Sequence, residues 1–384
     1  MGPLLLTFLL MGVQASPRGT ETGSAPGLPA AIDELGSIDY ETRTRASKVV
    51  RRAAPADAAA ALLTAIEQHD DGYVRYRALV LLSAFNNRTT PDVMRQAMYD
   101  PNDRLRAVAY AWFEAHPDHA IVPSLIEVLE RETSEFVRPS LIRALAAAGA
   151  DARVQQVLLR EVNRGEDFFR SAVIEALGRH GASYAVDALA AIAALEGPLQ
   201  DDAALALGRI GDRRALPVLA GLQRTAAREV QPAIAAGICL LGVNCGTHRG
   251  FLVRTLSFAE DSIGFQALLR GAAAGLGAIA STGDREAGSA LLDLGVPSRD
   301  PARAPIALAL ASTAVEDPAF LLDLLESRQD RPEALALLLE GFDMLEEDYA
   351  EERFFAAVRK AYWAAPERSP RRQLVEAVIT TLDF

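Results

Sequence analysis

The apolar positions along this chain recur with the spacing of an amphipathic helix rather than of a strand. Between residues 121 and 129 they fall at i, i+4, i+7 and i+8, on one helical stripe: Ile121, Leu125, Val128 and Leu129. A polar stretch over 130–135 separates this helix from a second one, which we expect to end at Gly149. Residues near such junctions are predicted N-caps: Asp70, Asp100, Thr133 and Asp151. The pattern therefore predicts pairs of short helices joined by polar turns.

This helix pair repeats along the chain. Six segments that begin with a large apolar residue carry Arg or Gln at their second position, at intervals of 31, 32, 32, 30 and 31 residues: Arg75, Arg106, Arg138, Arg170, Gln200 and Gln231. An earlier copy contains Arg45, and weaker copies lie near Gln266, Arg303, Arg331 and Arg371. One pair cannot bury both apolar faces, so the pairs are expected to stack into a continuous core. We predict an all-α fold, an α-solenoid (superhelix) of stacked antiparallel helix pairs with a period of about 31 residues.

The repeat unit resembles a known family. Its acidic loop, Val/Leu-Arg, apolar pair, Ala-Leu-Gly and Gly-Asp resemble the HEAT-like repeat, in the short form of phycobilin lyase-type proteins, and the best match is Leu205-Ala-Leu-Gly-Arg-Ile-Gly-Asp212. The resemblance implies an outer row of first helices and an inner row of second helices that line a concave groove. We assign regular repeats to 28–245 and degenerate, acidic repeats to 246–384, where the spacing becomes uneven.

Composition agrees with helix and narrows the class of partner. Half of the 384 residues are hydrophobic and only 6% are aromatic, and abundant Ala and Leu favour helix over strand. The net charge of −12 disfavours nucleic acid, which is bound by neutralising phosphates with Lys and Arg. Between Glu316 and Arg353 there are 13 acidic and 3 basic residues. The negative charge is thus concentrated in the C-terminal quarter.

The N-terminus has features of an export signal. An apolar run ends in small residues at Val13 and Ala15, where a signal peptidase cleaves, although no basic residue precedes the run. We expect a signal peptide at 1–15, a flexible linker at 16–27, and a periplasmic or secreted mature chain without a membrane span. If the run is not a signal, the protein is cytoplasmic. Cys239 and Cys245 either pair in an oxidising compartment or remain a buried thiol and a loop thiol.

Candidate chemistry is sparse. His116 and His119 lie in a loop between repeats, which favours surface residues over metal ligands, and His-Glu-x-x-His is absent. The stretch from Gly275 to Ala280 matches G-x-G-x-x-A, but a helix rather than a strand precedes it, so it belongs to the repeat. No nucleophile elbow or P-loop occurs. The sequence therefore predicts no metal site, no cofactor and no catalytic residues.

The arginines at the second repeat position allow two interpretations. Each can bond to the acidic loop of the adjoining repeat and fix the stacking, or the row can face the groove and bind an acidic partner together with nearby tyrosines. Tyr, Trp and Arg dominate interface energetics. On the second interpretation the partner-binding residues are Arg45, Tyr73, Arg75, Tyr76, Arg77, Arg104, Arg106, Arg138 and Arg170. Tyr110 and Trp112 are assigned to the core.

These features favour a non-enzymatic protein-binding scaffold or adaptor that acts through the shape and charge of a concave face. Two alternatives stay open. One is an enzyme or ligand-binding protein of the phycobilin lyase-like HEAT class, and the other, less favoured, is nucleic-acid binding. The sequence indicates neither the partner nor the oligomeric state.

Overall fold

The computed structural model describes residues 27–85, 87–260, 264–345 and 347–384. Within these ranges the chain forms 22 α-helices and four short 3-10 turns and contains no strand. The predicted signal peptide, and the predicted linker except for Gly27, lie outside the described residues. The all-α solenoid is confirmed.

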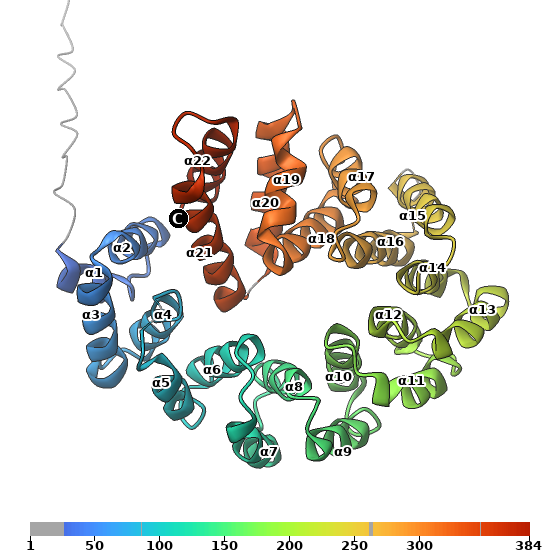
Figure 1. Cartoon of the computed structure of the whole chain (residues 1–384), viewed down its shortest axis with the longest axis horizontal. Helices are drawn as coiled ribbons and strands as arrows, with labels where there is room; N and C mark the ends of the chain where they lie inside the picture. The colour runs from blue at the N-terminus through green and yellow to red at the C-terminus, as the bar shows by residue number, and fades with distance from the viewer. Residues whose placement is uncertain (1–26, 86, 261–263, 346) are drawn as a thin grey trace, which may run out of the picture.

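The helices form two rows around a ring, shown in Figure 1. The outer row comprises α1 (Leu28–Glu34), α3 (Pro55–Gln68), α5 (Thr90–Ala97), α7 (Val122–Arg131), α9 (Ala152–Glu161), α11 (Val186–Ala193), α13 (Leu216–Thr225), α15 (Cys245–Glu260), α17 (Arg285–Gly295) and α19 (Pro318–Glu326). The inner row comprises α2 (Tyr40–Arg52), α4 (Gly72–Leu82), α6 (Asp103–Ala115), α8 (Arg138–Ala147), α10 (Asp167–Arg179), α12 (Gln200–Ile210), α14 (Gln231–Leu240), α16 (Gln266–Ala280), α18 (Arg303–Glu316) and α20 (Arg331–Leu345). In every pair from α1–α2 to α17–α18 the two helices pack on each other, and each inner helix packs on the next inner helix, so the stack of pairs has the predicted HEAT-like repeat architecture.

The turns between helices use mostly the expected residue types, but not always the expected residues. Asp151 caps α9 as predicted by accepting a hydrogen bond from the Arg153 amide. Asp71 caps α4 and Asn102 caps α6, in place of the predicted Asp70 and Asp100. Asp100 accepts from the Asn102 amide instead. The helix that we expected to end at Gly149 ends at Ala147.

Glycines set the close approach of the later inner helices. A Cβ added at Gly208 of α12 would overlap the backbone of Gly237 in α14, and one at Gly341 of α20 would overlap the Ala307 carbonyl of α18. A Cβ at Gly178 of α10 would lie 2.8 Å from the Ala206 Cα. The Gly of the repeated Ala-Leu-Gly motif therefore stands where two inner helices touch backbone to backbone.

The apolar core is divided into two clusters that meet near α14. One runs from Ala31 to Leu241 and the other from Ala235 to Phe384. Tyr349 lies in the C-terminal part of the chain but belongs to the first cluster. Cys239 and Cys245 form a disulfide between α14 and α15, with their Cα atoms 4.1 Å apart.

The last two helices, α21 (Asp348–Ala364) and α22 (Pro370–Leu382), depart from the two-row pattern. Helix α22 packs on α19 and α20, whereas α21 contacts α4 and α6 at the other end of the chain. In Figure 1 the red C-terminal helices lie beside the blue N-terminal ones. The concave groove is thus closed into a ring.

In the described part of the chain, no helix by itself is both long enough and apolar enough to cross a membrane. Helices α18 and α19 meet that test only as a pair, by length and composition, and they are bent by 118° relative to each other.

Candidate functional site

Basic side chains of the first inner helices pair across the ring with acidic side chains near the C-terminus. The pairs are Lys48–Asp383, Arg51–Glu352, Arg77–Asp348, Arg143–Glu347 and Arg179–Glu316. The first four join α2, α4 and α8 to α21, to Glu347 just before it and to Asp383 at the end of α22. We call these four pairs, together with Tyr349 beside Trp112, the seam. Acidic side chains of the C-terminal quarter thus neutralise individual basic side chains of the N-terminal half of the same chain.

The pair between Arg51 and Glu352 is the most buried contact of the seam. Arg51 Nε and Nη2 donate to Glu352 Oε2 at 3.0 and 2.5 Å, and only 6% and 1% of the two side chains are exposed. Arg359 also donates to Glu352, at 3.3 Å, and the Arg51 guanidinium lies 5.3 Å from the Phe355 ring centre. Removing one partner of such a pair leaves a buried charge uncompensated, which is strongly destabilising.

Carboxylates are crowded at the start of α21. Arg77 Nη1 donates to Asp348 Oδ1 at 2.6 Å, which favours the charged carboxylate, but burial and the charge of Glu352 prevail and raise the pKa of Asp348 to about 6. Burial, followed by the charge of Asp348, raises the pKa of Glu351 to about 7. Burial also lowers the pKa of Arg77. Closing the ring therefore holds carboxylates where their charged form is disfavoured.

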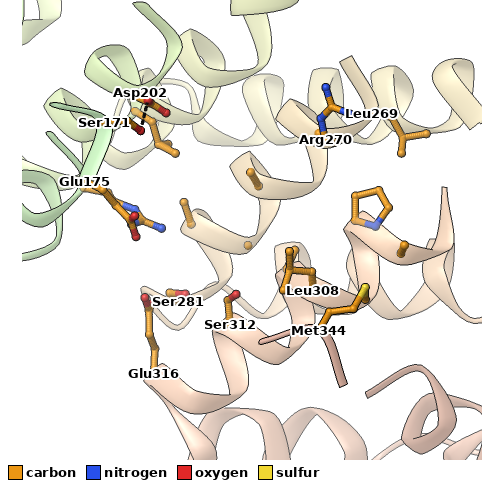
Figure 2. A pocket seen from close by; sticks show the side chains of 18 of the residues that line it. Ser171, Glu175, Asp202, Leu269, Arg270, Ser281, Leu308, Ser312, Glu316 and Met344 are labelled. Atoms are coloured by element: carbon orange, nitrogen blue, oxygen red, sulfur yellow. Dashed lines mark hydrogen bonds between the residues drawn. The ribbon is translucent and has the colours of Figure 1, made fainter. Parts of the chain in front are cut away.

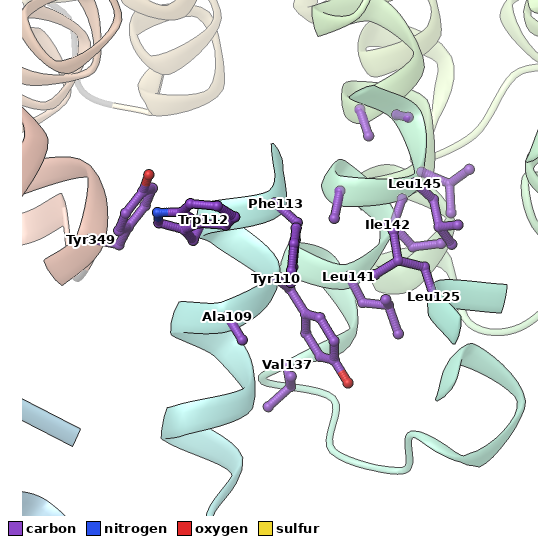
Figure 3. Close-up of a cluster of buried hydrophobic side chains, with 14 of the residues drawn as sticks. Ala109, Tyr110, Trp112, Phe113, Leu125, Val137, Leu141, Ile142, Leu145 and Tyr349 are labelled. Atoms are coloured by element: carbon purple, nitrogen blue, oxygen red, sulfur yellow. The ribbon is translucent and has the colours of Figure 1, made fainter. Parts of the chain in front are cut away.

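Aromatic side chains line the N-terminal side of the seam. The half-buried Tyr73 and the buried Tyr76 have ring centres 5.7 Å apart, and the Arg104 guanidinium lies 5.8 and 5.6 Å from them. Figure 3 shows the ring of Tyr349 of α21 next to Trp112 of α6, and both belong to the same buried apolar cluster. Tyr110 and Trp112 are buried in the core, as predicted.

The structure gives each member of the predicted arginine row a local contact. Arg75 pairs with Asp100 and also donates to the Ile66 carbonyl. Arg106 forms a fork with Glu132, at 2.8 and 2.9 Å. Arg138 lies 3.7 Å from the Phe169 ring centre, Arg170 donates to the Val162 carbonyl and pairs with Asp167, and Arg45 donates to Thr42 on the surface. The contacts of Arg75, Arg106 and Arg138 join successive repeats.

The predicted residues Arg77, Arg104, Tyr73 and Tyr76 are brought together beside α21, whereas the second-position row is not. Helix geometry explains the difference, because residues two or nine positions apart lie on opposite sides of an α-helix. Arg77 follows Arg75 by two positions and Arg179 follows Arg170 by nine, so both face the lumen. Sequence reasoning missed the three other arginines that pair across the ring: Arg51, Arg143 and Arg179. The acidic stretch from Glu316 to Arg353 contains the carboxylates that pair with these arginines, but the sequence did not indicate which carboxylate pairs with which arginine.

A cavity of about 630 Å³ opens on the lumen away from the seam, between α10, α12, α16, α18 and α20. Its apolar wall includes Leu205, Ala278, Pro305, Leu308 and Met344. Figure 2 shows Leu308 and Met344 side by side in this cavity, and 38% and 37% of these residues remain exposed. The cavity is large enough for a drug-sized ligand.

Charged side chains border the cavity on the α10 and α12 side. Arg179 pairs with Glu175 and Glu316 at 3.0 and 3.6 Å. Burial would raise the pKa of Glu175, but the charges of Arg179 and Arg209 outweigh it and the pKa is lowered. Ser171 donates to Asp202 at 2.5 Å, and burial raises the pKa of that carboxyl group.

Two further arginines of the cavity, Arg209 and Arg270, take no part in the ion pairs of this network. Neither Arg209 nor Arg270 lies within ion-pair distance of an acidic side chain among the residues that the structure describes. The cavity therefore offers two guanidinium groups beside exposed aliphatic side chains.

The histidines form ordinary side-chain contacts. The His116 ring stacks on Trp112 with ring centres 4.2 Å apart, and His180 Nε2 lies 3.2 Å from a Glu114 oxygen. Across the described ranges, no group of three or more His, Cys, Asp or Glu residues is arranged to hold a metal ion. Gly275 and Gly277 lie within α16 and pack against Ala236 and Ala309.

Comparisons with known proteins support no family assignment. No family model and no curated protein matches the chain. Among solved structures, YibA from Escherichia coli is 17% identical over 56% of this chain and 81% of its own, with a TM-score of 0.41. The CpcE–CpcF complex of phycocyanin lyase from Nostoc sp. is 17% identical over 87% and 100%, with a TM-score of 0.27. Importin beta is 12% identical over 92% and 58%, with a TM-score of 0.36.

Proposed function

We propose that this chain is a non-enzymatic protein-binding scaffold that holds a segment of a partner protein in the cavity between α10, α12, α16, α18 and α20. The observation that carries the proposal is that the exposed side chains of Leu308 and Met344 lie in the same concave site as Arg209 and Arg270. Apolar side chains left accessible in a concavity gain free energy when a ligand covers them. The guanidinium groups select a carboxylate. The segment would thus carry an acidic residue next to aliphatic ones.

The set of predicted partner-binding residues can be reduced to four. Arg77, Arg104, Tyr73 and Tyr76 face the lumen side and remain candidates for a partner contact. Arg75 and Arg106 already have acidic partners in the neighbouring repeat, and we propose that the second-position row, with Arg138 and Arg170, serves the stacking. The net charge of −12 supports a protein partner over nucleic acid.

A small amphipathic carboxylate is a second candidate ligand for the same cavity. The volume of about 630 Å³ favours it, since pockets for small ligands have volumes of roughly 300–1,000 Å³. On this reading the chain is a ligand-binding protein without a partner segment.

We also propose that the protein is exported. The apolar run before Ala15 supports this, as does the disulfide between Cys239 and Cys245, because disulfides persist in oxidising compartments. Cell fractionation, with mass spectrometry of the mature N-terminus and of the thiols, tests this. Full-length protein with reduced cysteines in the cytoplasm would contradict it.

The test of the binding proposal is a selection from a random peptide display library on the full chain, followed by fluorescence titration of the enriched peptides. We expect peptides with aliphatic and acidic residues, and at least a tenfold loss of affinity when Leu308→Asp and Met344→Asp are combined. Leu195→Asp is the matched control, because Leu195 is also exposed (68%) but lies outside the cavity.

The outcomes separate the candidates. Peptides that bind the cavity variant and the wild type equally would place the binding site elsewhere. If no peptide is enriched but dodecanoate binds with a dependence on Arg209 and Arg270, the small carboxylate is the ligand.

A further inference from the structure

Helix α21 presents its acidic and aromatic side chains as one stripe. Asp348, Glu352, Phe355 and Arg359 follow at i, i+4, i+7 and i+11, a single face of an α-helix. Asp348 and Glu352 pair with Arg77 and Arg51, and Phe355 lies under the Arg51 guanidinium. An amphipathic helix seated with one stripe in a groove is a recurring mode of peptide recognition.

The groove that receives this stripe is built from helices at the far end of the chain. Arg51 of α2, Arg77 of α4 and Arg143 of α8 supply positive charge. Trp112 of α6 supplies an aromatic surface beside Tyr349. A cavity of about 270 Å³ remains between α6, α8 and α21, lined by Arg104, Arg143 and Tyr349 among others. The fit is therefore made by charge and aromatic contact and leaves space uncovered.

The seam is chemically unlike the other helix contacts of the ring. Inner helices α10 to α20 meet through Gly and Ala backbones, whereas α21 meets α2, α4 and α8 through charged side chains. Water and salt compete for charged groups, and truly exposed ion pairs contribute little free energy. Glu347 and Asp383 of the seam are 40% and 58% exposed. The buried pair Arg51–Glu352 is the exception, so α21 can be exchanged only for a helix that supplies an equivalent carboxylate to Arg51.

We propose that the lumen face of α2, α4, α6 and α8 is a docking surface for an acidic amphipathic helix, that α21 is its intramolecular occupant, and that a partner helix with the same pattern displaces α21. The pattern is a carboxylate at i and i+4, with aromatic residues at i+1 and i+7. This surface is distinct from the cavity of the proposed function, because it lies on α2, α4, α6 and α8 and the cavity lies between α10, α12, α16, α18 and α20. The helix that occupies it, α21, indicates which ligand fits. The partner that displaces α21 is an acidic helix of another protein.

The test uses a fluorescein-labelled peptide of residues 347–364 and the full chain. The wild type is compared with Glu352→Arg, which repels α21 from Arg51 but leaves the docking surface intact. We expect at least tenfold tighter binding of the peptide to Glu352→Arg than to the wild type, because the intramolecular competitor is weakened. A peptide with Asp348→Asn, Glu351→Gln and Glu352→Gln should lose at least tenfold in affinity. Adding Arg77→Glu to the Glu352→Arg protein should likewise weaken binding.

Helical circular dichroism and the melting temperature identify any variant that fails to fold. For folded variants, equal peptide affinity of the wild type and Glu352→Arg, or no binding to either, would overturn the proposal and make the seam a fixed part of the fold. If Glu352→Arg forms a dimer that the peptide dissociates, the occupant is α21 of a second copy. That result would overturn the proposal that the partner is a helix of another protein. Neither result depends on the cavity variants Leu308→Asp and Met344→Asp.

Discussion

The ring is held by two different kinds of helix contact. From α10 to α20, inner helices touch where glycine and alanine let their backbones meet, as Gly208 does with Gly237 and Gly341 with Ala307. At the seam, α21 reaches α2 and α4 through paired charges such as Arg51–Glu352. Backbone contact tolerates no added atom and responds little to solution conditions. Charged contact tolerates displacement but depends on pH and salt. The stack is therefore the frame of the ring, and the seam is its adjustable part.

The largest predicted effect comes from adding one methyl group to the stack. In Gly208→Ala the new Cβ overlaps the Gly237 backbone, so α12 and α14 must separate at a cost of more than about 3 kcal/mol in the free energy of unfolding. Gly221→Ala in α13 is the matched control, because nothing lies within 4 Å of its added Cβ. It should gain about 0.5–1 kcal/mol from helix propensity. Urea unfolding followed by circular dichroism measures both, and equal midpoints would contradict the backbone contact.

The next effect is the loss of the buried pair at the seam. Glu352→Ala leaves Arg51 and Arg359 without their shared carboxylate, which we expect to cost about 3 kcal/mol. Because the stack itself is untouched, the ring should open before the repeats unfold, and X-ray scattering should show a larger maximum dimension.

The double variant Arg51→Leu with Glu352→Leu tests the cause of that loss. Replacing both charges removes the uncompensated Arg51 guanidinium and leaves only Arg359, whose side chain is 27% exposed, without the Glu352 carboxylate. An apolar pair of similar size is often neutral or stabilising. Stability near that of the wild type is expected. A double variant as unstable as Glu352→Ala would show that shape rather than charge holds α21.

The fold could be predicted because its determinants are local and repeated. The apolar stripe, the Arg at the second position and the Ala-Leu-Gly motif each recur within one helix pair, so the stack follows from nearest-neighbour packing. The exact helix boundaries were harder to predict. Asp71 and Asn102 cap helices for which we expected Asp70 and Asp100, because several capping residues lie together in each turn.

The sites were predicted only in part. The sequence indicated Arg77, Arg104, Tyr73 and Tyr76 only within a larger set of nine candidate residues, and separately an acidic C-terminal stretch. It could not indicate that the two meet, since Arg51 and Glu352 are 301 residues apart and their contact depends on the curvature summed over the whole ring. The cavity with Leu308 and Met344 was missed for the same reason, as its walls come from five helices.

The third prediction concerns pH. The pKa of Glu351 is raised to about 7 in the closed ring, above the ordinary carboxyl value of about 4.3, so closure binds a proton. Its contribution to closure is therefore full below pH 4 to 5 and is lost as the pH rises through about 7. The titratable and charged groups around Glu351 are Arg43 and Arg51 of α2, Tyr73 and Arg77 of α4, Glu347, Asp348 and Glu352 at and before the start of α21, and Asp383.

Glu351→Gln isolates this effect, because the amide imitates the protonated carboxyl group. The variant should keep the ring closed at pH 8, where the wild type begins to open, and the two should match at pH 5. The distance between spin labels on exposed sites of α2 and α21 reports closure. If the wild-type ring opens on acidification instead, the pH dependence of closure has the opposite sign. The ion pairs of the seam, rather than Glu351, would then determine closure.

The smallest predicted effect distinguishes the two interpretations of the arginine row. Arg106 forms two hydrogen bonds to Glu132, of whose side chain only 3% is exposed, so Arg106→Met should cost about 2 kcal/mol by leaving a buried carboxylate unpaired. Arg153→Met removes a pair with Asp151 on the surface and should leave the unfolding midpoint unchanged. Loss of stability at Arg106 with unchanged affinity for the selected peptides would make the row a stacking device. Unchanged stability with weaker peptide binding would return the row to the groove, and the stacking would then rest on the apolar core and the glycine contacts.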